Sequence, residues 1–348
     1  GRIYRYMTVF QDEDHYRMYY ACPKVTGYGA ERQRFPERIN LATSRDGIHW
    51  ERPHLNLFSL PELKVNPVVW IEDGVKRFGI SGFSPFRDPR PDCPPEQRYK
   101  AIAEAGPAGK KAFGHNGLLA LVSPDGIHWK NLVPKPVITG GPGLGAFDSQ
   151  NLAFWDAVRG EYRLYRREVF REGPHKAFRD VLTATSPDFL HWSEPQRLNY
   201  PGAPAEQLYT NNILPYPRAP HLFLGFPVRY VQRPWSDAIA DLPERDRRER
   251  LIRESGAEPN ENDPTGAGGV RIGTSLTDVL FMSSRDGLHF HRPGQAFIRP
   301  GLRGKDNWFY PDNYPAWGML PTPSAIEGAP DELSFYLSEG GRRPGQPN

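Results

Sequence analysis

The feature that most constrains this chain is a seven-residue motif that recurs four times. The motif begins with Ser-x-Asp, continues with a fourth position that is Gly in three copies, and ends with an aliphatic residue, a His and an aromatic residue. Its copies begin at Ser44, Ser123, Ser186 and Ser284. Each copy follows a short apolar run, as in a strand that enters a tight turn. Glycine accepts positive φ, and Ser and Asp side chains cap turn amides. The third copy has Phe189 instead of Gly, so we expect its turn to differ.

A second motif, Asn followed by three residues and an aromatic residue, marks another strand in each repeat. Its copies are residues 66–70, 151–155, 212–216 and 313–317, with a weaker copy at 6–10. A strand-like segment follows in each unit, at residues 16–20, 99–103, 162–166, 222–226 and 333–337. Together the two motifs predict units of four strands, with the Asn strand innermost.

Radial repetition of four-stranded units is typical of a β-propeller. We therefore predict an all-β chain that forms one domain over residues 1–348, a five-bladed β-propeller with four-stranded antiparallel blades. The blades are expected to start near residues 3, 65, 147, 207 and 310. A solenoid is the competing repeat architecture, but the irregular spacing favours a closed propeller. The first and fifth units look incomplete, so we expect truncation at one or both ends.

An insertion rich in Arg and Glu interrupts the fourth unit at residues 231–269. A short helix followed by a polar loop is expected there. It is either a solvated excursion of the chain or, alternatively, a lid or an oligomer contact.

Composition excludes several functional classes. Lys and Arg number 44 and Asp and Glu 41, a net charge of +3 that argues against a nucleic-acid surface. No apolar run is long enough for a membrane span. Neither a cofactor nor a metal site is predicted, because no ligand spacing is recognisable. A carbohydrate is the predicted partner, a secreted or periplasmic location is expected, and the oligomeric state is open.

Carboxylates precede three of the expected inner strands, where loops on a rigid scaffold concentrate function. They are Asp148, Glu206 and Asp312. Two carboxylates flanking a cavity suit glycoside hydrolysis, because one protonates the leaving oxygen and the other activates water or attacks the sugar. Residues beside these acids, or at the ends of the second strands, are the predicted substrate-binding set: Phe147, Gln150, Asn151, Tyr209, Asn212, Trp308, Tyr310, Asn313, Arg167, Glu168, Arg229 and Glu339.

Structural interpretations compete with these functional ones. The repeated Asn residues are expected mainly to cap backbone groups. The histidines and aspartates of the turn motif recur in equivalent outer positions, so they cannot all reach one site. By contrast, Asp148 and Glu206 break the repeat, which favours function for both.

These motifs, together with residues 147–156 and 184–192, resemble the arabinanase, levansucrase and invertase superfamily, which includes glycoside hydrolase families 43 and 32. The chain looks closest to uncharacterised bacterial propeller proteins that resemble family 32. The resemblance implies three acids, of which Asp148 matches a helper Asp and Glu206 the proton donor. The first-blade acid has no counterpart here, and the Asn-Asp-Pro-Asn-Gly motif of family 32 is absent; Asp312 is the candidate base.

Two functions follow from the sequence. The first is a glycoside hydrolase that acts on a polysaccharide or oligosaccharide at the propeller channel. The second is a non-catalytic glycan-binding propeller that uses the same aromatic rim. The distance between carboxylates across an open pocket separates the two.

Overall fold

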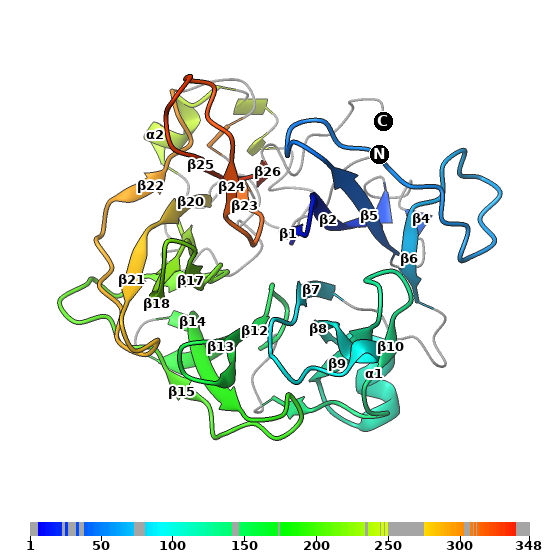
Figure 1. Ribbon diagram of the computed structural model, residues 1–348. Coiled ribbons are helices and arrows are strands. Elements are labelled where there is room, and N and C mark those ends of the chain that lie inside the picture. Colours follow the sequence, from blue (N-terminus) through cyan, green and yellow to red (C-terminus); the bar gives the residue numbers. More distant parts are fainter. Residues whose placement is uncertain are drawn as a thin grey trace.

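Strands dominate the fold of this protein. A computed structural model describes residues 6–22, 25–26, 33–34, 38–72, 81–140, 146–172, 175–233, 236–243, 245–246, 248–249, 275–302, 307–308, 310 and 312–338. The strands form antiparallel sheets set around a common centre, with β1, β7, β12, β17 and β23 nearest to it (Figure 1). None of the helices in these ranges is long and apolar enough to cross a membrane.

In each of the first three sheets, four strands follow one another in chain order from the centre outward, and the second sheet has a fifth strand. The first sheet comprises β1 (Thr8–Asp12), β2 (His15–Cys22), β5 (Arg38–Ser44) and β6 (Val68–Ile71). The second comprises β7 (Ser81–Arg87), β8 (Tyr99–Glu104), β9 (Gly117–Ser123) and β10 (Lys130–Asn131), with β11 (Ile138–Thr139) also paired to β9. The third comprises β12 (Leu152–Asp156), β13 (Glu161–Glu172), β14 (His175–Ser186) and β15 (Gln196–Arg197).

The fourth group of strands is split into two ladders. One ladder contains β16 (Gln207–Leu208), β19 (Val228–Val231), β20 (Leu276–Leu280) and β22 (Ala296–Ile298). The other contains β17 (Leu214–Tyr216), β18 (Ala219–Gly225) and β21 (Met282–Ser284). The break follows Gly225, where Pro227 has no N–H to offer the ladder.

The last described strands form two short pairs. They join β23 (Tyr314–Pro315) to β26 (Leu337–Ser338) and β24 (Leu320–Thr322) to β25 (Glu332–Ser334).

The remaining elements lie in connections. They are the strand pair β3 (Val25–Thr26) and β4 (Gln33–Arg34), the 3-10 helix η2 (Pro95–Gln97), α1 (Gly106–Phe113) and α2 (Asp237–Ala240). The last of these agrees with the short helix expected in the insertion, most of which falls outside the described residues.

One expected inner strand is wrong. Residues 66–70 were predicted to begin the second blade, but β6 pairs with β5 at the outer edge of the first sheet. The inner strand of the second sheet is β7, which carries no Asn motif. Its Gly82 has φ +66, and an added Cβ would lie 2.4 Å from the carbonyl oxygen of Ser149. The feature that identifies this inner strand is the close approach of its Gly82 backbone to Ser149, not an Asn.

The ring closes between the two ends of the described chain. Thr8 forms a parallel bridge with Trp317. The Val9 amide donates to the Trp317 carbonyl at 2.8 Å, and the Trp317 amide donates to the Met7 carbonyl at 2.8 Å. The first inner strand is thereby held beside the last group of strands. This closure favours the propeller over the solenoid; the blade count of five stays a prediction.

The four turn motifs share one hydrogen-bond pattern. In each copy the Ser hydroxyl accepts the amide of the fourth residue at 2.9 Å. One Asp oxygen accepts the backbone amides of the fifth residue and of the His at 2.8 to 2.9 Å. The other Asp oxygen lies 2.6 to 2.7 Å from Nδ1 of the His ring. These histidines are exposed at the periphery, which supports their structural interpretation.

The turn glycine also joins neighbouring sheets. Tyr19 of β2 donates its hydroxyl to the Gly126 carbonyl at 2.8 Å, and Tyr165 of β13 donates to the Gly287 carbonyl at 2.9 Å. Tyr336 donates in the same way to Gly47, which links the last strands to the first sheet. We call these three bonds the tyrosine latches. All three glycines have positive φ: +75 at Gly126, +78 at Gly287 and +75 at Gly47. Because glycine has no Cβ, the tyrosine hydroxyls can approach the turns closely.

The third turn has no tyrosine latch, which explains its exceptional residue. The second-sheet position equivalent to Tyr19 is Ile102, which has no hydroxyl. Phe189 takes the glycine's place with φ 72 and is fully buried. Its ring packs edge-on against Phe86 of β7 in the second sheet, with centroids 5.9 Å apart. An apolar contact between sheets therefore replaces a hydrogen bond.

Removal of one latch should destabilise the ring. We expect Tyr165→Phe to lower the free energy of unfolding by about 1–2 kcal/mol, because the buried Gly287 carbonyl loses its donor. Tyr216→Phe is the matched control, since its hydroxyl makes no hydrogen bond with the described residues. Urea denaturation of both variants measures the difference; equal stabilities would contradict the latch.

The turn carboxylates predict a loss of stability in acid. Burial alone would raise the pKa of Asp125, but the amide and ring of His128 and the amide of Ile127 lower it to about 2. Because the folded pKa lies below the unfolded one, Asp125 stabilises the fold above about pH 4 and loses this effect as pH falls toward 2. Asp125→Asn should flatten the pH dependence of stability between pH 5 and 2, measured by urea titrations. An unchanged slope would refute this role.

Candidate functional site

A layer of buried amide side chains lies where the inner strands begin. It consists of Gln150, Asn151, Asn211 and Asn212, all at most 2% exposed. Gln150 donates to the Met7 carbonyl at 3.0 Å and to the Thr8 hydroxyl at 3.1 Å. We call these four residues the amide layer. Because it bonds third- and fourth-sheet segments to each other and to β1, it holds the inner strands in place.

The amide layer changes the interpretation of several predicted substrate contacts. Asn151 donates to the Phe147 carbonyl at 2.9 Å and accepts the Arg167 amide at 3.2 Å. Asn212 donates to the Pro315 carbonyl at 2.8 Å. Asn313 is buried and donates to the Thr277 carbonyl at 3.4 Å. These residues and Gln150 therefore bond to the protein itself, in line with the capping role expected of the repeated Asn.

The aromatic rim predicted from the sequence needs correction. Phe147, Tyr209 and Tyr310 are at most 2% exposed, so their rings offer no open face to a sugar. Tyr209 and Tyr310 pack edge-on with centroids 6.0 Å apart. Trp308 is half-buried, and its indole N–H donates to the Gly301 carbonyl at 3.1 Å. The buried aromatic rings beside the inner strands therefore pack in the core.

Asp148 is the predicted acid that reaches solvent. Its side chain is 64% exposed on the segment that leads into β12, and its Oδ2 lies 3.8 Å from Nη2 of Arg167. Arg167 is buried, with its guanidinium 5.0 Å from the centre of the Tyr209 ring. A carboxylate thus faces solvent while one positive charge lies behind it.

Glu168 is a second carboxylate on the neighbouring strand. Its Oε2 accepts from Arg166 at 2.7 Å, its Oε1 accepts the Val169 amide at 3.0 Å, and its side chain is 11% exposed. Across the ladder it faces Asp180. Burial raises the pKa of Asp180, although Arg197 and Tyr200 donate to its carboxylate. Two carboxyl groups are therefore adjacent on β13 and β14.

Glu206 lies in an ion network instead of at a free mouth. Its two oxygens accept from two different arginines, Arg229 and Arg292. Arg229 in turn forms a two-pronged pair with Asp278, at 2.9 and 2.6 Å. We call these four residues the Glu206 network. A carboxylate held on both oxygens by guanidinium groups suits a structural tie better than a proton donor.

Counting along the Asn motif explains the difference between the two acids. Asp148 lies three residues before Asn151, whereas Glu206 lies six residues before Asn212. The position that matches Asp148 is filled by the buried Tyr209. Sequence reasoning also missed Asp278 and Arg292, which lie outside both motifs and give no signal before the sheets are paired.

The other predicted residues divide as follows. Asp312 is buried, its backbone amide donates to the Thr277 hydroxyl at 2.8 Å, and its Oδ1 accepts the Asn313 amide at 3.0 Å. Arg229 belongs to the Glu206 network, and Glu339 lies outside the described residues. Within the described part of the chain, no three His, Cys, Asp or Glu side chains are grouped so as to hold a metal ion.

The two acids should respond differently to neutralisation. Glu206→Gln should lower the free energy of unfolding by about 1–3 kcal/mol, because Arg229 and Arg292 lose a shared, partly exposed counter-charge. Asp148→Asn, an exposed and equally conservative change, should stay within about 0.5 kcal/mol of the parent. Chemical denaturation of both variants tests the contrast, and a larger loss for Asp148→Asn would refute it.

Comparisons with solved structures agree on the fold. An N-acetylgalactosamine deacetylase from F. plautii matches with a TM-score of 0.54 and 14% identity, over 97% of this chain and 85% of that one. The α-L-arabinofuranosidase Arb93A from Fusarium graminearum matches with a TM-score of 0.51 and 11% identity, over 96% and 74%. An endo-arabinase from Bacteroides thetaiotaomicron matches with a TM-score of 0.50 and 10% identity, over 97% and 94%.

No protein-family model matches this chain, and no curated protein sequence matches it either. At 10–14% identity the structural matches speak for the fold. The chain therefore shares the propeller-type fold of these carbohydrate-active enzymes, as the resemblance to the arabinanase, levansucrase and invertase superfamily predicts.

Proposed function

We propose that this protein is a glycoside hydrolase, built on a five-bladed propeller, that cleaves a polysaccharide or oligosaccharide beside the start of β12. The observation that carries the proposal is Asp148, an exposed carboxylate backed by the buried Arg167. Functional groups on loops before the inner strands are held by a rigid scaffold, and here the amide layer supplies that rigidity. Related folds in an arabinofuranosidase and an endo-arabinase support the substrate class.

Glycosidic cleavage needs a second carboxylate, and Glu168 is the candidate next in the chain to the arginine behind Asp148. Glu168 follows Arg167 in β13, and Nη2 of Arg167 lies 3.8 Å from Oδ2 of Asp148. We assign Asp148 as the carboxylate that activates water or stabilises positive charge on the sugar ring, with Glu168 as its partner. In this proposal Glu206, the donor expected from the sequence, acts on stability through its ion network.

Glycan binding without cleavage is the second candidate. The observation that favours it is the state of the other two predicted acids: Glu206 is engaged by two arginines and Asp312 is buried. A mouth with Asp148 as its exposed acid can orient sugar hydroxyls without cleaving a glycosidic bond.

An activity screen with matched variants separates these functions. Arabinan, aryl arabinofuranosides and N-acetylgalactosamine glycosides form the first panel, because an arabinofuranosidase, an endo-arabinase and an N-acetylgalactosamine deacetylase have similar folds. Asp148→Asn and Glu168→Gln should each lower kcat/KM about 10²-fold or more. Glu206→Gln, assayed well below its unfolding temperature, should keep activity within about fivefold.

Three results bear on the assignments. Activity lost in Glu206→Gln but kept in Asp148→Asn would restore the sequence-based donor and refute ours. Glycan binding by the folded protein, with no cleavage of any panel member, would support the binding module. Release of acetate from intact N-acetylgalactosamine glycosides would replace glycosidic cleavage with deacetylation.

A further inference from the structure

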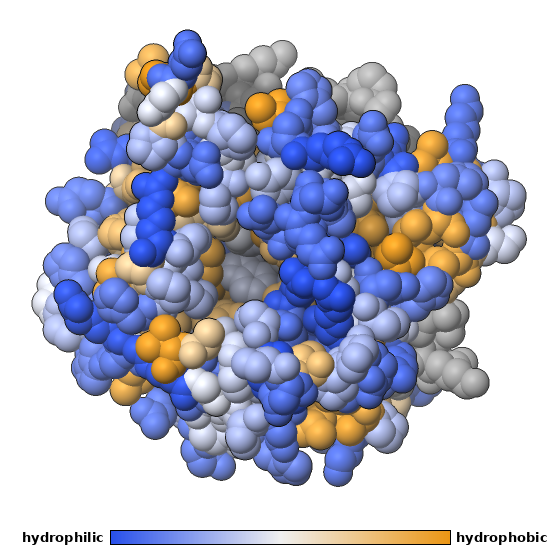
Figure 2. All heavy atoms as spheres, viewed as in Figure 1, coloured by the Kyte–Doolittle hydropathy of each residue, from blue (hydrophilic) through white to orange (hydrophobic). Residues whose placement is uncertain are grey.

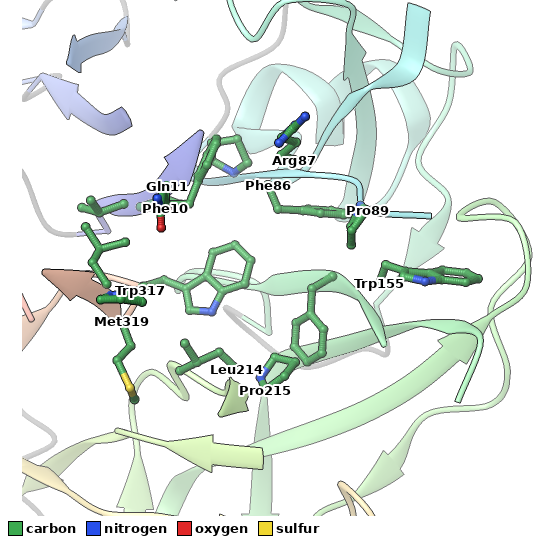
Figure 3. A pocket seen from close by; sticks show the side chains of 17 residues that line it. Phe10, Gln11, Phe86, Arg87, Pro89, Trp155, Leu214, Pro215, Trp317 and Met319 are labelled. Atoms are coloured by element: carbon green, nitrogen blue, oxygen red, sulfur yellow. The ribbon is translucent and has the colours of Figure 1, made fainter. Parts of the chain in front are cut away.

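A cavity lies on the axis of the ring. It has a volume of about 250 Å³ and takes its walls from β1, β7, β12, β17 and residues 317–321 (Figure 3). In Figure 3 the indole of Trp317 lies between Phe86 on one side and Leu214 and Pro215 on the other. We call this space the axial cavity. The face shown in Figure 2 is hollowed at its centre, in the same region of the ring.

The axial cavity lies beyond the amide layer from Asp148. β12 runs from Leu152, next to that layer, to Asp156, and the cavity contacts its later residues Phe154 and Trp155. It likewise contacts Arg87, the last residue of β7. A ligand here would therefore be separated from the proposed catalytic carboxylate by buried, hydrogen-bonded side chains. This site is independent of the proposed function.

The walls of the axial cavity are mainly apolar, and their polar groups already have partners. Arg87 pairs with Glu13 at 2.9 Å and lies 3.6 Å from Asp12. The Trp317 indole N–H donates to the Ile213 carbonyl at 3.0 Å. Thr8 accepts from Gln150. Gln11 donates its side-chain amide to the Glu13 carbonyl at 3.3 Å. Apart from Gly318, the remaining lining is built of Phe, Trp, Leu, Met, Val and Pro side chains with backbone between them.

This chemistry selects the ligand. A sugar would bring several hydroxyl groups into a space with few groups to pair with them, and each unpaired hydroxyl would oppose binding. An anion would find the charge of Arg87 already balanced by two carboxylates. A neutral aromatic ring loses little on leaving water and gains contact with Trp317 and Phe86. We propose that the axial cavity is a binding site for a neutral, apolar ring compound of one or two fused rings.

Indole is a suitable probe, and calorimetry of the full chain is the test. We expect saturable binding of one indole per chain with a negative heat-capacity change, the mark of buried apolar surface. Leu214→Phe fills the cavity and should weaken binding at least tenfold. Ile48→Phe is the control: it also introduces a phenyl ring, but at a residue that is 75% exposed, and it should leave indole binding unchanged.

Several outcomes overturn the proposal. Absence of indole binding by the folded parent protein does so, as does equal binding by Leu214→Phe and the parent. A second filling variant, Met319→Phe, covers the case in which Leu214→Phe fails to fold. L-Arabinose, titrated in parallel, should not compete with indole; competition would place a sugar site in the cavity and refute its apolar character.

Discussion

A hydrogen bond between a tyrosine hydroxyl and the carbonyl of a turn glycine in the next sheet is the contact on which this structure depends. It recurs as Tyr19 to Gly126, Tyr165 to Gly287 and Tyr336 to Gly47. Each turn is first shaped by its own Ser and Asp, so the glycine carbonyl is presented at a fixed angle. The last of the three bonds closes the ring. Where the third turn lacks this bond, the ring contact of Phe189 with Phe86 joins the second and third sheets instead.

The axis is divided by polarity. The amide layer ties Gln150 to Thr8 of β1 and Asn212 to Pro315, so hydrogen-bonded amide side chains lie where the inner strands begin. Near the start of β12, Asp148 faces solvent above Arg167. Beyond the layer, Trp317 and Phe86 border an apolar cavity. One ring of strands thereby offers two environments, a charged mouth at which we propose sugar binding and an apolar space in which we propose binding of ring compounds.

The sequence predicts features that depend on neighbouring residues better than features that depend on the whole fold. Turn motifs are local, so the Ser-x-Asp repeats predicted the four turns. The segments expected as second strands agree with β2, β8, β13 and β18, whereas residues 333–337 divide between β25 and β26. The substitution of Phe189 for glycine is understood only when Ile102 is seen at the latch position of the preceding sheet. Residues 66–70 share the inner-strand pattern but pair at an outer edge, because pairing depends on the whole sheet. The sequence alone predicts Glu206 as the proton donor, because it does not show that Arg229 and Arg292 pair with this carboxylate in the fold.

We propose that glycans are recognised beside Asp148, at the start of β12. Amide hydrogen–deuterium exchange, with and without an oligosaccharide that the protein binds or cleaves, tests this site. We expect added protection in residues 146–152 and 164–169, the segments that carry Asp148, Arg167 and Glu168. Protection confined to the strand ends around Trp155 and Met319, or to the Glu206 network, would contradict it.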